Sequence, residues 1–114
     1  VRDILHVRDL FRLIDHQIHH LEDFNGQTFN VGGGPACSIS LAELTALCSE
    51  VTGNDIQIGP AGFSRPADVP VYITDNTRIS TLSGWKPECS PLEIVTDIYQ
   101  WIIDNRLQLE RILN

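Results

Sequence analysis

Six apolar residues recur at steps of three and four near the start of the chain, and this spacing constrains the fold more than any other feature. They are Val7, Leu10, Phe11, Ile14, Ile18 and Leu21. Residues with that spacing share one face of an α-helix. The sequence therefore predicts a helix that turns this face toward a core and carries polar side chains on the opposite face. Those polar side chains are Arg8, Arg12, Asp15, His16 and His19.

Two further helices are marked by capping boxes, in which a serine is followed three residues later by a glutamate. Ser40 and Glu43 begin a helix from about 40 to 52, which ends at Gly53. Ser90 and Glu93 begin the last helix, where a proline occupies the first turn. We expect the inward side chains of these two helices to be Leu41, Leu44, Leu47, Cys48 and Val51 in the first, and Ile94, Ile98, Trp101 and Ile102 in the second.

A shorter helix and several strands complete the predicted elements. Asp75 can cap a helix from 76 to 83 that Gly84 ends. Short β-prone segments are expected at 2 to 6, 28 to 31, 56 to 58 and 71 to 74. The glycines at 32 to 34 lack the spacing of a dinucleotide-binding loop, so we interpret them as a turn. Short strands with about four helices predict an α/β fold.

Length and charge limit the kinds of protein that the chain can be. With 114 residues, 42% of them hydrophobic, the chain is large enough for one domain and too short for two. Eight basic and fifteen acidic side chains give a net charge of -7, which argues against a nucleic-acid partner. The apolar runs are shorter than the ~20 residues of a membrane helix, and no signal peptide precedes Val1. We therefore expect a cytoplasmic protein without membrane contact.

The cysteines and histidines give no strong sign of a metal site or of disulfides. Cys37, Cys48 and Cys89 are odd in number and lack Cys-x-x-Cys spacing, so we expect reduced, structural thiols. The histidines at 16, 19 and 20 can share a helix face, as metal ligands do. They lie on the polar side of the predicted helix without a cysteine or a fixed carboxylate pair nearby, and we interpret them as a solvated surface. No metal ligand is predicted.

Two arginines are candidates for an anion site. Arg2 and Arg65 each lie at the edge of a predicted strand or loop, and two guanidinium groups can grip a diphosphate through bidentate hydrogen bonds. The alternative is a pair of surface ion bridges, in which Arg2 meets Asp3 or Asp9 and Arg65 meets Asp68. From these residues alone, the surface bridges are the simpler interpretation.

Several motifs, in order along nearly the whole chain, resemble those of extended short-chain dehydrogenase/reductases. Residues 1 to 10 resemble the segment VRDxxHVxDL, and residues 28 to 34 resemble xFNVGGG. Residues 38 to 44, the Arg-Pro-Ala-Asp at 65 to 68 and the Gly-Trp-Lys-Pro at 84 to 87 follow in family order. The resemblance is to the NAD-dependent nucleotide-sugar epimerases and dehydratases, and among these to the CDP-paratose 2-epimerase type.

The resemblance implies a role for five residues. Arg2 and Arg65 would contact the diphosphate of a nucleotide sugar, and Asp68 would lie by the nucleotide ribose. His6 and Asp9 would hold the strand-to-helix turn together. The family usually has glycine where this chain has Ala67. If that position requires a positive φ, alanine strains the loop and changes the direction of the Arg65 side chain.

The chain lacks the groups that the family's chemistry requires. No glycine fingerprint is present, and neither Tyr72 nor Tyr99 has a lysine four residues later; the single lysine is Lys86. No catalytic and no cofactor-binding residue is predicted. The chain contains no methionine and starts within an apolar alternation, which is how a segment cut from a longer chain would look.

We therefore expect residues 1–114 to be the C-terminal, nucleotide-sugar-binding part of such an enzyme, without a complete Rossmann domain. NAD would bind to an N-terminal Rossmann part outside these residues, and the chain alone would be inactive. The isolated chain is expected to form a homodimer through an open strand edge at 28 to 31 or through exchange of the helix at 90 to 105. The alternative is a free-standing α/β protein-interaction module that has lost the ligand.

Overall fold

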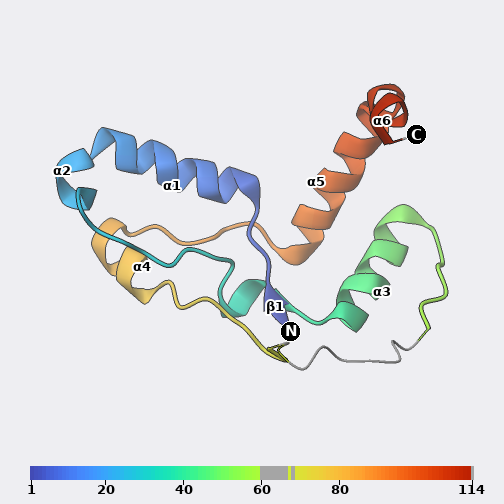
Figure 1. Ribbon diagram of the computed structural model, residues 1–114, viewed down its shortest axis with the longest axis horizontal. Coiled ribbons are helices and arrows are strands. Elements are labelled where there is room, and N and C mark those ends of the chain that lie inside the picture. The colour runs from blue at the N-terminus through green and yellow to red at the C-terminus, as the bar shows by residue number, and fades with distance from the viewer. Residues whose placement is uncertain (60–66, 68, 114) are drawn as a thin grey trace.

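The computed structural model describes residues 1–59, 67 and 69–113, which form an open α/β structure composed mostly of helices (Figure 1). Two short strands, β1 and β2, pair antiparallel at its centre, with Arg2 opposite Ile39 and Asp3 opposite Ser38. The elements in chain order are β1 Arg2–Asp3, α1 Val7–His19, α2 Leu21–Phe24, the 3-10 helix η1 Pro35–Cys37, β2 Ser38–Ile39, α3 Leu41–Thr52, α4 Thr77–Ser83, α5 Pro91–Asp104 and α6 Arg106–Leu113. None of the helices in this described part is both long and apolar enough to cross a membrane.

The predicted helix ends are confirmed. Helices α3 and α5 both begin with a complete capping box, in which the serine side chain accepts a bond from the glutamate N–H and the glutamate carboxylate accepts from the serine N–H. Gly53 and Gly84 end α3 and α4 in the left-handed conformation, with φ of 70° and 71°. The start of α4 differs from the prediction: its cap residue is Asn76 rather than Asp75, and the helix begins one residue later, at Thr77. The Thr77 N–H still donates to the Asp75 carboxylate at 2.8 Å.

The best-packed part of the molecule lies between α1, α2 and α4. Its buried side chains are Leu13, Phe24, Ile79 and Trp85. Leu13 and Ile79 are 1% and 0% exposed. Trp85 packs directly behind the end of α4, as predicted, and its indole N–H donates to the main-chain carbonyl of Asp9 at 3.0 Å.

The predicted inward face of α1 was wrong. Val7 and Phe11 are 74% and 65% exposed, and the remainder of that apolar stripe is also exposed. The helix instead packs through Asp9 and Leu13, each 1% exposed. These two side chains lie on the side of α1 that meets α4 and the segment from 85 to 89, so the stripe points away from the rest of the described chain.

The inward face predicted for α5 is largely wrong, and the face predicted for α3 is only half-buried, at Leu44, Leu47, Cys48 and Val51. In α5, Ile94 and Val95 are buried, whereas Ile98, Trp101 and Ile102 are exposed. Helix α5 begins near the centre of the molecule, and the rest of the helix projects outward toward α6 (Figure 1). Helix α3 has no buried residue, and Leu41 at its start is 83% exposed.

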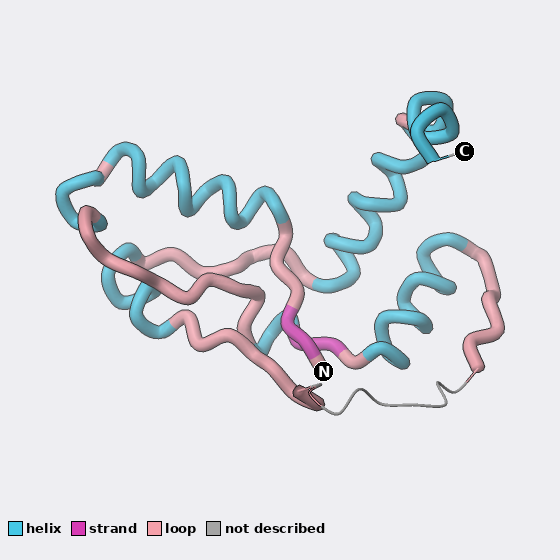
Figure 2. The backbone as a smooth tube through the Cα atoms, viewed as in Figure 1, coloured by secondary structure: helices cyan, strands magenta, loops and turns pink. Residues whose placement is uncertain are grey.

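Most of the predicted strands are absent from the described residues, because a strand needs a neighbour for its hydrogen bonds. Segments 28 to 31 and 56 to 58 are irregular, and the strand predicted at 2 to 6 is reduced to β1. Within 71 to 74, Tyr72 alone forms a bridge, parallel to Arg2. Segment 28 to 31 therefore offers no strand edge of the kind expected to drive dimer formation. Long loops connect the helices (Figure 2).

The chain exposes more surface than a compact protein of its size. Its accessible surface is 8822 Å² at a mass of 12.8 kDa. A folded monomer of that mass exposes about 6,300 Å², so the excess is roughly 2,500 Å². The radius of gyration is 17.3 Å, whereas a compact chain of this length has about 13 Å. Much of the apolar surface thus lacks a covering partner within the described chain.

Candidate functional site: a cleft beside Arg2

A cleft of about 440 Å³ lies beside β1 and the start of α3. Its lining residues are Val1, Arg2, Ile4, Ile39, Ser40, Leu41, Leu44, Val69 and Pro70. Strand β1 places Arg2 there because it pairs with β2 on one side and meets Tyr72 on the other. The Tyr72 N–H donates to the Val1 carbonyl at 3.0 Å, and one Arg2 guanidinium nitrogen donates to the same carbonyl at 2.8 Å.

The cleft combines one cationic side chain with largely aliphatic walls. Of the lining residues named above, Arg2 has the only ionisable side chain. The adjacent start of α3 carries a negative charge, the Glu43 carboxylate. This group accepts hydrogen bonds from Ser40 N–H at 2.8 Å and from Ser40 Oγ at 2.6 Å. The Ser40 hydroxyl, followed by its N–H, holds the pKa of Glu43 below its usual value. An anion with an attached apolar or flat group suits such a cleft.

The other two predicted site residues, Arg65 and Asp68, lie outside the described residues. Val69 and Pro70, which follow them directly, line the same cleft as Arg2. Whether the two arginines meet at one anion therefore stays a prediction.

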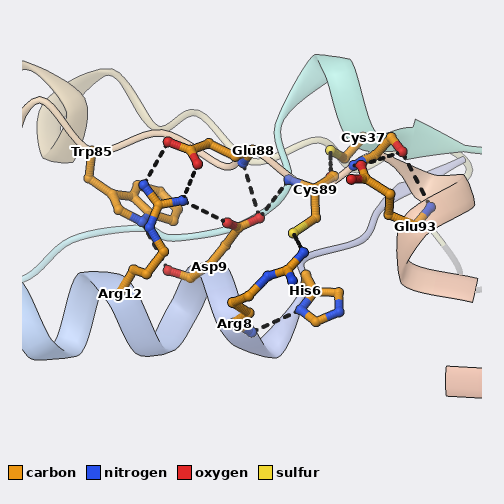
Figure 3. A network of polar contacts seen from close by, with 10 residues as sticks. His6, Arg8, Asp9, Arg12, Cys37, Trp85, Glu88, Cys89 and Glu93 are labelled. Carbon is orange, nitrogen blue, oxygen red and sulfur yellow. Dashed lines mark hydrogen bonds and ion pairs between the residues drawn. The ribbon is translucent and has the colours of Figure 1, made fainter. Parts of the chain in front are cut away.

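Asp9 belongs to a buried polar network away from the cleft (Figure 3). Its carboxylate accepts hydrogen bonds from the N–H groups of Glu88 at 3.1 Å and Cys89 at 3.0 Å, and from Arg12 at 3.3 Å. Burial alone would raise the pKa of Asp9, but the N–H groups of Cys89 and Glu88 and the charge of Arg12 together lower it. Asp9 thus fastens α1 to the segment before α5.

His6 fastens α1 at its first turn. Its Nδ1 accepts the N–H of Arg8 at 2.9 Å, which caps the helix, and its Nε2 lies 3.1 Å from a carboxylate oxygen of Asp97 in α5 (Figure 3). The expectation that His6 holds the strand-to-helix turn together agrees with this geometry. Asp9 was expected to hold the same turn together. Its carboxylate instead holds residues 88 and 89, about 80 residues away along the chain.

The glycine triplet crosses closely under β1. A Cβ atom on Gly33 would lie 1.9 Å from the Ile4 carbonyl oxygen, and Gly34 N–H donates to the Asp3 carboxylate at 2.9 Å. Asn76 bonds both main-chain groups of Gly32, at 3.1 and 2.9 Å. The triplet is therefore a tightly packed turn. Asn76 was not predicted as a contact of the triplet, because the two lie 44 residues apart and no local pattern marks the contact.

The side chains of the three histidines near the end of α1 contact groups a few residues away, in α1 and in α2. The rings of His16 and His20 stack at 4.2 Å, and His20 Nδ1 lies 2.9 Å from the His16 carbonyl. His19 Nδ1 lies 2.7 Å from the carbonyl of Asp15. No cluster of three or more metal-ligand side chains occurs in the part of the chain that the structure describes.

The chain is similar to several known proteins whose names refer to nucleotide sugars. The chain is 30% identical over 101 residues to CDP-paratose 2-epimerase of Salmonella typhi, which covers 89% of this chain and 30% of that protein. It is 28% identical to putative GDP-L-fucose synthase 2 of Arabidopsis thaliana, over 95% of this chain and 31% of that protein. It is also 28% identical to UDP-glucose 4-epimerase of Caenorhabditis elegans, over 92% of this chain and 30% of that protein.

No protein-family model matches the chain. The chain spans about 30% of the length of the relatives named above. Their names confirm the resemblance to nucleotide-sugar epimerases that the motifs indicated.

Proposed function

We propose that this chain, similar over about nine tenths of its length to enzymes named for nucleotide sugars, binds the nucleotide sugar of an NAD-dependent epimerase or dehydratase. It would act as the C-terminal part of that enzyme, with an N-terminal Rossmann part supplied by other residues. The observation that carries the proposal is the position of Arg2 on the wall of an aliphatic cleft.

The chemistry of the cleft supports a nucleoside diphosphate. A guanidinium group donates up to two parallel hydrogen bonds to a phosphate, and aliphatic walls suit a base or a sugar face. CDP, GDP and UDP all appear in the names of the relatives, and all three are nucleoside diphosphates. The similarity of 30% to a CDP-paratose 2-epimerase favours a CDP-sugar 2-epimerase type of substrate as the finer proposal.

The chain's connectivity supports roles for Arg65 and Asp68. Val69 lines the cleft, and Arg65 precedes it by four residues. Four residues span at most about 14 Å, a chain length that is compatible with the role proposed for Arg65 at the cleft. In this proposal Arg65 supplies a second guanidinium to the diphosphate, and Asp68 accepts hydrogen bonds from ribose hydroxyl groups.

The described residues do not fit NAD. The backbone of Ile4 fills the space beside Gly33 that a pyrophosphate would need, and Lys86 has no tyrosine four residues before it. We therefore derive no catalytic step from this chain and assign NAD to the proposed Rossmann part. Its own residues would bind and orient the nucleotide.

The uncovered surface supports the proposal over a free-standing interaction module. The excess of roughly 2,500 Å² is about three times what one partner contributes to a standard protein interface. An area of that size is typical of parts that fold together, and the proposed Rossmann part would cover it. Without that cover, we expect the isolated chain to associate with itself, as a homodimer, through its exposed apolar side chains.

Titration calorimetry of the chain with CDP, UDP and dTDP tests the proposal. We expect binding, and a loss of about 1.5 to 3 kcal/mol for Arg2→Ala or Arg65→Ala, the usual contribution of hydrogen bonds to a charged group. Arg106→Ala is the matched control, because Arg106 pairs with Glu110 on α6 and is not among the cleft residues. Equal affinity in both cleft variants and the control would contradict the proposal.

Two further measurements test its other parts. The purified chain should neither retain NAD nor interconvert nucleotide sugars, and turnover above a buffer control would contradict the assignment of catalysis to other residues. Sedimentation across a dilution series should show a dimer that dissociates at low concentration. A monomer at every concentration would favour the free-standing module.

A further inference from the structure

Two buried cysteines from distant segments meet beside the Asp9 network. Cys37 ends η1 and Cys89 precedes α5, and both are 4% exposed. The Cys37 thiol donates to the main-chain carbonyl of Cys89 at 3.1 Å, across 52 residues of sequence (Figure 3). A disulfide between the two cysteines would require the Cys89 side chain to rotate from Arg8 toward Cys37.

The Cys89 sulfur itself contacts a positive charge. A guanidinium nitrogen of Arg8 lies 3.1 Å from Cys89 Sγ, and the hydrogen bond to Cys89 is the main cause that raises the pKa of Arg8 (Figure 3). The Arg8 guanidinium is placed to stabilise negative charge that develops on this sulfur when it attacks as a nucleophile. Burial, followed by the negative charge of Asp9, raises the pKa of the Cys37 thiol. The two thiols are therefore unequal in their surroundings.

We propose that Cys89 and Cys37 form a peroxide-responsive thiol pair, in which Cys89 is oxidised first and Cys37 completes a disulfide. In the first step, the Cys89 thiolate attacks hydrogen peroxide, an S–O bond forms, the O–O bond breaks and hydroxide leaves. In the second step, the Cys37 sulfur attacks the Cys89 sulfur, the S–S bond forms, and the S–O bond breaks. The thiol proton of Cys37 leaves with the oxygen as water. Peroxide is the oxidant and both cysteines are oxidised.

Cys48 offers a matched control within the chain. It is less buried than the other two cysteines and lies on α3, and its carbonyl accepts from Thr52 Oγ1. If exposure decided oxidation, Cys48 would react first. If the contact between Arg8 and Cys89 decides it, the more buried Cys89 reacts first.

The experiment treats the reduced chain with equimolar hydrogen peroxide and maps its cysteines by peptide mass spectrometry over time. We expect a linked peptide pair containing Cys37 and Cys89, with Cys48 still free. In Cys37→Ser the reaction should stop at a sulfenic acid on Cys89 that dimedone traps. Arg8→Gln should slow the loss of the Cys89 thiol about tenfold, whereas Arg8→Lys, which keeps the charge, and the distant Arg106→Gln should slow it far less.

Three results would overturn the proposal. The first is oxidation of Cys48 before Cys89. The second is an equal rate of 37–89 linkage in buffer and in concentrated urea, because the pairing would then owe nothing to the fold. The third is an Arg8→Gln variant that reacts as fast as the unaltered chain.

Discussion

Two regions of the molecule differ in how completely they pack. Around α1, α2 and α4, the side chains of Leu13 and Ile79 are almost fully enclosed. Around α3, α5 and α6, burial is limited to the first turn of α5, and neither α3 nor α6 has a buried residue. The first region encloses a small apolar core, although α1 also exposes an apolar face, and the second region encloses almost none of its apolar side chains. One short chain thus combines a self-sufficient core with a surface that needs a cover.

The same contrast runs through α1 alone. Its inner face holds Asp9 and Leu13, whereas its outer face holds Phe11 and Ile14, at 65% and 45% exposure. The outer face has the stronger apolar pattern. Hydrophobic periodicity therefore identified a face suited to burial, but the described chain does not contain the partner for that face.

The largest expected effect is in the packed region. Ile79→Ala should lower the free energy of unfolding by about 3 to 4 kcal/mol, because it leaves a cavity in a fully enclosed site. Leu107→Ala on α6, where the side chain is 77% exposed, should change it by less than about 0.5 kcal/mol. Urea denaturation measures both. Similar losses in the two variants would erase the contrast between the regions.

Removal of the Asp9 carboxylate should have the next largest effect. Asp9→Ala leaves the N–H groups of Glu88 and Cys89 without their acceptor, and we expect a loss of about 2 to 3 kcal/mol in urea denaturation. Asp104→Ala is a control, since its carboxylate accepts from Gln100 on an exposed face of α5. A loss no greater than in the control would mean that the network does not hold α1 in place.

Acid should weaken the same network. The pKa of Asp9 is lower in the folded chain than its ordinary value of 3.8, so its stabilisation is present above pH 3.8 and is lost as the pH falls through the folded pKa. Thermal unfolding followed by circular dichroism should therefore show a steep loss of stability below pH 3.8. Asp9→Ala should show a shallower loss, and identical pH profiles would contradict the role of this group.

The capping boxes allow a finer comparison in the open region. Ser40→Ala and Ser90→Ala should each lower the unfolding free energy by about 1 kcal/mol. Ligand affinity should stay the same in Ser90→Ala. Because Ser40 lines the cleft, the ligand affinity of Ser40→Ala should be measured separately by calorimetry. No stability loss for Ser40→Ala would indicate that α3 does not form without a cover.

The smallest effect is expected on the outer face of α1. Phe11→Ser should change the unfolding free energy of the monomer by less than about 0.5 kcal/mol, because the side chain is already exposed. It should nevertheless weaken self-association in sedimentation, since it removes apolar surface from the stripe. A large stability loss without any change in association would place Phe11 in the core.

The features that were predicted from sequence are local ones. Both capping boxes and the glycines that end α3 and α4 depend on residues a few positions apart, and the structure has them. Strand pairing and helix burial depend on distant partners, and these predictions were mostly wrong. In the candidate site, Arg2 could be singled out because its motif is local, and its role in binding stays a prediction. The network of Asp9 with Glu88 and Cys89 spans 79 and 80 residues, and no short pattern encodes its geometry.

The close crossing of Gly33 and Ile4 has a consequence for how natural variants of this protein should be interpreted. Any side chain at position 33 would displace the Ile4 carbonyl, and Ile4 follows β1 and lines the cleft. Because Arg2 lies two residues before Ile4, in β1, a shift of the Ile4 main chain would also move Arg2. Under the proposed function, a substitution at this glycine would therefore lower ligand affinity, although Gly33 is not among the residues that line the cleft.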